Sequence, residues 1–324
     1  MNAVVQFDIH IPQVARTYEE MLTYARRAES GGITSFWLYD HLYAPGLPNR
    51  YSLERWAAVA LLAQTSDLRL GHLVLNNNFR HPVMVAKMAA TLDMISGGRL
   101  NLGVGSGSNE FEHLEGGFSW GTTSDRAGRL ANALEIITAI LGQDRSRVEG
   151  PYYQTRDVPG LPRPAQRPGV PIYVGGIGPR RTLPVVARYA DVWNVPTYGL
   201  AKWDEAASVF DAACSEIGPE PGTVRRSLEA VLVVGSDDAS SRAILATAER
   251  RYPGVGWGLL DGGFTGSVQA VVDRIGVWME RGFTEFVFFP ADRGDGPIIE
   301  ILAEEIIPAF QPGTQTPEVP SHDV

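Results

Sequence analysis

Short apolar runs alternate along this chain with longer segments in which apolar residues recur every three or four positions. Apolar runs of about four to eight residues are typical of buried parallel strands, whereas the longer spacing is typical of amphipathic helices. Between Arg99 and Val104, for example, Leu100 and Leu102 mark a short buried strand. Eight strands are predicted in this way, at residues 4–9, 34–39, 68–75, 99–104, 171–175, 191–195, 228–234 and 285–289.

Helix signals fill the intervals between these strands. Thr17-Tyr18-Glu19-Glu20 forms a capping box ahead of one helix, Pro82 fits the first turn of another, and Ser124 is the predicted cap of a third. Further helices are predicted at residues 53–65, 180–189, 201–217, 240–251, 268–281 and 297–310.

These repeated units of strand and helix predict a (β/α)8 TIM barrel. A doubly wound sheet could use the same order of elements, but it rarely needs eight such evenly repeated units. We expect one domain at residues 1–310, with insertions at about 143–170 and 235–266, the first of them holding a small hairpin. Residues 311–324 are polar and contain proline, which predicts a flexible C-terminal tail.

Composition restricts the function classes. The chain has 324 residues, of which 44% are hydrophobic, and its net charge of −9 with no basic block disfavours nucleic acid as a partner. Neither a membrane span nor a signal peptide is evident, so a cytoplasmic protein is expected. Cys214 is the only cysteine, and the six histidines lack the spacing of a metal site, so we expect neither an internal disulfide nor a metal.

Barrel enzymes place their active sites in the loops that follow the strands. This rule selects four clusters, at residues 40–41, 74–80, 105–110 and 175–181. Asp40-His41 follows an aromatic strand, and a histidine there can move a proton near neutral pH. The competing structural explanation is a helix-capping aspartate beside a hydrogen-bonded histidine, and the barrel position favours function over it.

A glycine-rich turn joins the fourth predicted strand to acidic residues. Gly103-x-Gly105 is followed by Ser108 where a dinucleotide fingerprint needs its third glycine, and no lysine follows as a P-loop requires. The serines also lack the flanking glycines of a hydrolase nucleophile. We therefore expect this turn to bring Asn109 and Glu110 to a ligand and not to bind phosphate.

A second glycine-rich segment, Gly175-Gly176-Ile177-Gly178-Pro179-Arg180, passes from a predicted strand into a helix. Free N–H groups at a helix N-terminus suit a phosphate, although an ordinary turn with solvated arginines would look the same. The loop that begins at Asn76 is rich in amides, which can hydrogen-bond to the edge of a ring.

Taken together, the segments SFWLYDH, LGHLVLNNNFRHPVMVAKMAATLDMISGGRLNLGVGSGSNEFE and PIYVGGIGPRRTLPVVARYADVWN resemble the bacterial luciferase-like superfamily, in particular its branch that uses the deazaflavin coenzyme F420. The resemblance covers most of residues 4–310. It implies a barrel with insertions, usually a homodimer, and hydride transfer between the deazaflavin and a small-molecule substrate. An FMN-dependent monooxygenase of the same superfamily is the alternative, and a non-catalytic flavin-binding or structural barrel is a third possibility.

The resemblance also implies roles for individual residues. His41 would lie near the reacting carbon, Glu110 would lie by one edge of the ring, and either of them would deliver the proton. The remaining residues implied or expected to contact the cofactor are Asp40, Leu73, Val74, Asn76, Gly107, Asn109, Gly175, Gly176, Ile177, Gly178 and Arg180, with a cis peptide between Leu73 and Val74.

The substrate pocket is expected to differ from that of relatives that act on sugar phosphates. Those dehydrogenases carry a tryptophan soon after Asp-His and lysines around the phosphate, whereas this chain has Leu42-Tyr43-Ala44-Pro45 and only two lysines, Lys87 and Lys202. Glucose 6-phosphate is therefore not expected to be the substrate. The residues that we predict to line the substrate pocket are Trp193, Asn194, Thr197, Trp257 and Arg293.

Overall fold

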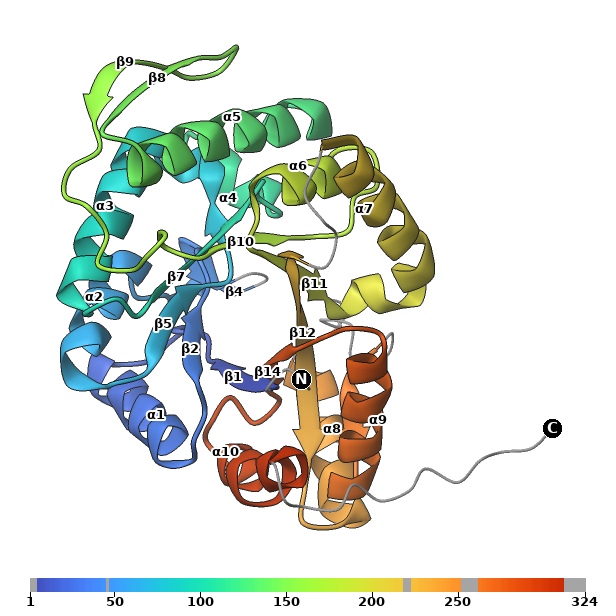
Figure 1. Ribbon diagram of the computed structural model, residues 1–324. Coiled ribbons are helices and arrows are strands. Elements are labelled where there is room, and N and C mark those ends of the chain that lie inside the picture. Colours follow the sequence, from blue (N-terminus) through green and yellow to red (C-terminus); the bar gives the residue numbers. More distant parts are fainter. Residues whose placement is uncertain (1–4, 45–46, 218–222, 252–261, 312–324) are drawn as a thin grey trace.

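The computed structural model describes residues 5–44, 47–217, 223–251 and 262–311, and its centre is a closed barrel of eight parallel strands (Figure 1). Going around the barrel, the strands follow in the order β1, β2, β5, β7, β10, β11, β12 and β14. Each strand pairs with the next, and β14 pairs with β1 to close the ring. The predicted TIM barrel is thus confirmed. The strands are β1 Gln6–His10, β2 Ser35–Leu38, β5 Arg69–His72, β7 Leu100–Gly105, β10 Ile172–Gly175, β11 Val192–Pro196, β12 Arg225–Val234 and β14 Glu285–Pro290.

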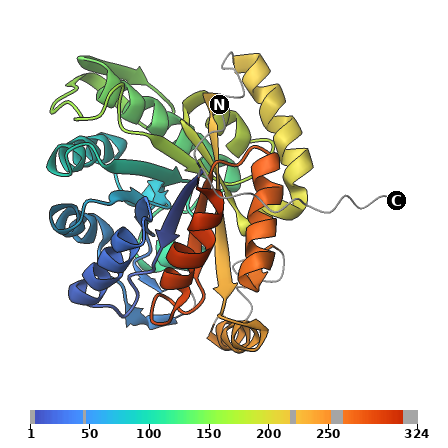
Figure 2. The same cartoon turned by 60° about the horizontal axis from the view of Figure 1, so that its bottom comes forward.

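Helices cover the outside of the barrel in both views (Figures 1 and 2). Their apolar faces pack on the strands, as Met21, Ala25 and Ala28 of the first helix do. None of the described helices is long and apolar enough to cross a membrane. The helices are α1 Tyr18–Ser30, α2 Arg55–Thr65, α3 Pro82–Ile95, α4 Glu110–Glu115, α5 Thr123–Gly142, α6 Thr182–Tyr189, α7 Trp203–Ile217, α8 Asp238–Arg251, α9 Val268–Glu280 and α10 Ile298–Ile301.

Local predictions differ from the structure at three places. The cap of α5 is Thr122 and not Ser124, because Thr122 and Asp125 satisfy each other's backbone N–H groups. The helix predicted at 297–310 keeps α-helical geometry only over α10 and then continues as a wider turn and a 3₁₀ turn around Pro308, which has no N–H to donate. The strand predicted at 68–75 breaks after His72 and resumes as β6 Leu75–Asn76.

Additional elements decorate the barrel. Strands β8 Arg145–Glu149 and β9 Gln154–Pro159 form an antiparallel hairpin that projects beyond α5 at the top of Figure 1, where a small hairpin was predicted. Within the second predicted insertion, α8 is followed by β13 Phe264–Gly266, which extends the sheet beside β12. Strands β3 Tyr43–Ala44 and β4 Leu47–Tyr51 form a further antiparallel pair that the sequence pattern did not indicate.

A pair of buried carboxyl groups lies inside the barrel. The Trp37 indole N–H donates to Asp8 Oδ2 at 2.9 Å, and the Tyr173 hydroxyl donates to Glu285 Oε2 at 3.0 Å. Burial raises the pKa of Asp8 well above its usual value, and the neighbouring charge of Glu285 raises it further. Burial also raises the pKa of Glu285, although Arg225 opposes this shift. One of the two carboxyl groups therefore tends to keep its proton.

We expect Asp8→Asn to raise the melting temperature at about pH 7, with a difference from the wild type that shrinks toward about pH 4. The folded protein holds the Asp8 proton more tightly than the unfolded chain does, so the wild type loses stability as the pH rises from the ordinary aspartate pKa through the raised one. The asparagine removes this titration and can still accept from Trp37. Thermal unfolding across pH measures the effect, with Asp204→Asn at an exposed carboxylate as the control. A pH-independent difference would contradict the prediction.

Candidate functional site

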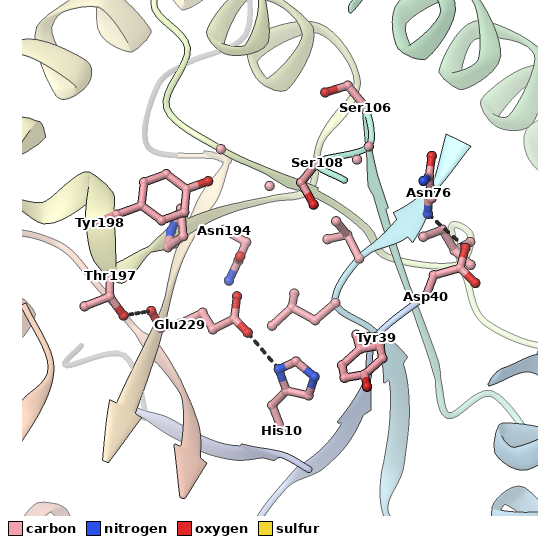
Figure 3. Close-up of a pocket in the computed structure, with 18 of the residues that line it drawn as sticks. His10, Tyr39, Asp40, Asn76, Ser106, Ser108, Asn194, Thr197, Tyr198 and Glu229 are labelled. Atoms are coloured by element: carbon pink, nitrogen blue, oxygen red, sulfur yellow. Dashed lines mark hydrogen bonds and ion pairs between the residues drawn. The ribbon is translucent and has the colours of Figure 1, made fainter. Parts of the chain in front are cut away.

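One cavity of about 400 Å³ opens where the carboxyl ends of the barrel strands meet (Figure 3). All eight strands, or the segments that directly follow them, contribute to its lining. The groups are His10 from β1, residues 39–41 after β2, 73–76 after β5, 105–108 at the end of β7, 175–178 at the end of β10, Asn194 and 196–198 from the end of β11, 229–231 from β12, and Phe289 from β14, together with Thr182. This is where a barrel enzyme is expected to hold its reacting groups.

Most of the residues predicted from the sequence meet in this cavity. Asp40, His41, Leu73, Val74, Asn76, Gly107, Gly175, Gly176, Ile177, Gly178, Asn194 and Thr197 all line it.

The other predicted residues lie outside its lining. Glu110 and Arg180 are exposed at the start of α4 and before α6. Trp193 is fully buried, and its indole N–H donates to the Gly176 carbonyl at 2.8 Å, so it supports the glycine segment from behind. Arg293 donates to the Val14 carbonyl. Asn109 is also not part of the lining, and Trp257 lies outside the described residues.

Asp40 is an anchored anion at the edge of the cavity. Its Oδ2 accepts from the Asn76 backbone N–H at 2.9 Å and from Arg80 Nη1 at 2.7 Å, and Arg55 lies 3.6 Å away. Burial alone would raise the pKa of Asp40, but the charges of Arg55 and Arg80 outweigh burial and hold it below the usual value. Asp40 therefore stays ionised and ties the chain after β5 to the chain after β2.

Leu73 and Val74 form an apolar platform on one side of the cavity, joined by the predicted cis peptide bond. The platform lies directly against β7, where two glycines make room for it. A Cβ atom on Gly103 would overlap the His72 carbonyl oxygen, and one on Gly105 would lie 2.5 Å from Val74 Cγ2. Gly103 and Gly105, which open the glycine-rich segment in the sequence, are thus the last part of β7 and serve this close packing.

His41 is held by a residue that was not predicted. Its Nδ1 lies 2.6 Å from Glu112 Oε2, and the other Glu112 oxygen accepts from the Leu42 backbone N–H at 2.7 Å. Because a carboxylate can only accept a hydrogen bond, this geometry places the imidazole proton on Nδ1. Nε2 is then the ring nitrogen that can take up or release a proton. Glu112 is fully buried, whereas Phe111 and Leu114 beside it are exposed, and this reversal of the usual helix pattern hid its role.

A second histidine and glutamate pair was also not predicted. His10 Nδ1 lies 2.7 Å from Glu229 Oε1, and both residues line the cavity. Two signals were available. His10 alternates with the core residues Phe7 and Ile9 along its strand, which turns it inward, and Glu229 is the lone charge in the apolar run predicted as a strand at 228–234.

The segment 175–178 offers backbone donors. The Gly176 N–H is used by the Asn194 carbonyl, but the N–H groups of Ile177 and Gly178 donate to no backbone carbonyl of the described residues. They precede α6, whose N-terminal end carries partial positive charge. This segment can therefore bind an anion such as a phosphate.

The family model described as "Luciferase-like monooxygenase" matches residues 3–285. The chain belongs to this family. It is 34% identical over 177 residues to an F420-dependent glucose-6-phosphate dehydrogenase from Amycolatopsis mediterranei, an alignment that spans 53% of this chain and half of that relative. An enzyme of the same name from Beutenbergia cavernae is 29% identical over 331 residues, or 90% of this chain and 93% of the relative.

Among solved structures, the F420-dependent tetrahydromethanopterin reductase from Methanopyrus kandleri shares the fold, with a TM-score of 0.78 and 21% identity over 95% of this chain and all of that one. The predicted relationship to luciferase-like proteins with F420-dependent homologues is thus confirmed.

We expect Gly103→Ala to destabilise the fold by about 1–3 kcal/mol, because the new methyl group meets a backbone oxygen that cannot move aside cheaply. Gly105→Ala should cost less, since it meets a side chain. Gly142→Ala is the matched control, as nothing lies within 4 Å of its added Cβ, and it should be neutral or stabilising by up to about 1 kcal/mol. Urea unfolding measures all three, and equal stabilities for the Gly103 and Gly142 variants would refute the packing explanation.

We expect Glu112→Gln to lower turnover by about a hundredfold or more, the size typical of a lost acid–base group. The glutamine presents an N–H₂ group to His41 Nδ1 and so favours the tautomer with its proton on Nε2. Nitrogen NMR of the imidazole reports this switch independently of activity. Glu110→Gln tests the sequence prediction in parallel, and a larger loss of turnover there than at Glu112 would reverse the assignment.

Proposed function

We propose that this protein is an oxidoreductase that uses coenzyme F420 and transfers a hydride between the deazaflavin and a small organic substrate. The observation that carries the proposal is the placement of His41, held by Glu112, beside the same cavity as the Leu73 and Val74 platform. Relatives named as F420-dependent support the choice of cofactor.

The cavity fits such a cofactor in three respects. The apolar platform suits one face of a flat ring, and Ser106 and Ser108, which also line the cavity, carry hydroxyl groups that can hydrogen-bond to its polar edge. The N–H groups of Ile177 and Gly178 suit the phosphate of its tail. When bound, the deazaflavin supplies the carbon that accepts or donates the hydride.

The chain's own residues would orient the reactants and move a proton. His41 can take or give a proton at Nε2 while Glu112 keeps Nδ1 protonated and the ring fixed. Asp40 keeps the loops on that side in register through Asn76 and Arg80. Proton delivery by His41 or Glu110 was predicted from the sequence, and the buried contact leads us to propose His41.

The substrate is proposed to lack a phosphate. Among the described residues that line the cavity there is no lysine or arginine, so a substrate phosphate would find no cation there. We therefore propose that glucose 6-phosphate is not the substrate, although two of the relatives carry that name.

Titration of the purified protein with oxidised F420, and separately with FMN, tests this function by the change in cofactor fluorescence. We expect F420 to bind saturably and an excess of FMN not to displace it. Tight binding of FMN without F420 binding would favour the monooxygenase alternative. Binding of neither cofactor would favour a non-catalytic barrel.

A further inference from the structure

The cavity has one side that the cofactor assignment leaves unused. His10, Asn194, Thr197, Tyr198 and Glu229 lie on it. Figure 3 shows the last four opposite Asp40 and Asn76, and His10 between Glu229 and Tyr39. They come from β1, from β12, and from the end of β11 with the 3₁₀ turn that follows it, and not from the segments that carry the platform and the glycines.

Glu229 is anchored at one oxygen only. Its Oε1 lies 2.7 Å from His10 Nδ1, and the Thr197 hydroxyl fixes the Glu229 backbone by donating to its carbonyl at 2.8 Å. Its Oε2 faces the cavity and accepts no hydrogen bond from the described residues, and the side chain is 20% exposed. A carboxylate oxygen is thus presented to whatever occupies this side of the cavity.

His10 is built to hold this carboxylate. It is 1% exposed, and the rings of Tyr39 and Phe289 pack edge-on against it at centroid distances of 6.1 and 5.8 Å. Because its position is fixed by this packing, the hydrogen bond to Glu229 also fixes the direction in which Oε2 points.

Glu229 also sets the sign of the local charge. The other carboxylate in the described lining is Asp40, whose charge is offset by Arg55 and Arg80, while no described lining residue is a lysine or arginine. In a cavity partly shielded from water, a single carboxylate attracts cations and hydrogen-bond donors and repels anions.

We propose that Glu229, positioned by His10, recognises the substrate through an ammonium or hydroxyl group and rejects carboxylates and phosphates. The pocket then accepts amines and alcohols as its substrate class. The selective binding does not depend on the function proposed above. The further statement that the bound molecule is the one oxidised or reduced does rest on that function.

Three probes that share one ring isolate the head group: cyclohexylamine, cyclohexanol and cyclohexanecarboxylate. Their affinities are measured at neutral pH by ligand-observed NMR on the full chain, with and without F420. We expect the ammonium to bind about tenfold or more tightly than the carboxylate, the gain of a charge-assisted hydrogen bond. Equal affinities, or a preference for the carboxylate, would overturn the proposal.

Glu229→Gln keeps the shape of the side chain and removes its charge. We expect it to abolish the preference for ammonium over carboxylate while alcohol binding changes by less than about threefold. Glu304→Gln makes the same charge change at an exposed position on the last helical segment and should leave the preference intact. A preference that survives in the Glu229 variant would overturn the assignment.

His10 is tested through the ratio of ammonium to alcohol affinity, which a general loss of folding does not shift. His10→Leu should lower this ratio, and His10→Asn, whose amide can replace the Nδ1 donor, should restore it. An unchanged ratio in His10→Leu would remove its positioning role.

The F420 titration is scored separately, so loss of cofactor binding with an intact ammonium preference would refute the proposed function and leave this inference standing.

Discussion

The absence of two side chains on β7 is the constraint on which the cavity depends. Without Cβ atoms at Gly103 and Gly105, the chain that leaves β5 can lie directly on its neighbour and present Leu73 and Val74 to the cavity. β6 then rejoins the sheet beside β7 and carries Asn76 to the point where Asp40 accepts its N–H. One close backbone contact therefore sets the platform, the Asn76 loop and the anchoring of Asp40.

Each charged group around the cavity is held by a specific partner from another element. Asp40 is held by arginines from α2 and from the loop before α3, His41 by Glu112 on α4, and Glu229 by His10 on β1. Fixed partners lower the cost of reorganising charge when a ligand binds. In each histidine and glutamate pair one atom is not used by the pair itself. This atom is His41 Nε2 on one side of the cavity and Glu229 Oε2 on the other.

The sequence predicted the barrel and much of the cavity wall, because both follow from periodicity and from the position of residues at strand ends. Asp40, Val74 and the segment 175–178 were found by that rule together with a family resemblance. Glu112 could not be found in this way, since it is buried while its apolar neighbours are exposed. Trp193 was placed in the cavity although it lies behind it, because the sequence does not reveal which side of a strand end a side chain takes.

The pair of His10 and Glu229 joins residues 219 positions apart in the chain. Strands β1 and β12 lie on either side of β14, so the pair spans the last strand of the barrel. Arg16 and Tyr24 also contact Asp295, and Arg27 contacts Glu300, so the first helix and the chain after β14 are joined as well. The side of the cavity that holds His10 and Glu229 thus forms only when the first and last strands of the described barrel have paired. A ligand on this side of the cavity can therefore bind only to the closed barrel, and its binding stabilises the pairing of the first strand with the last.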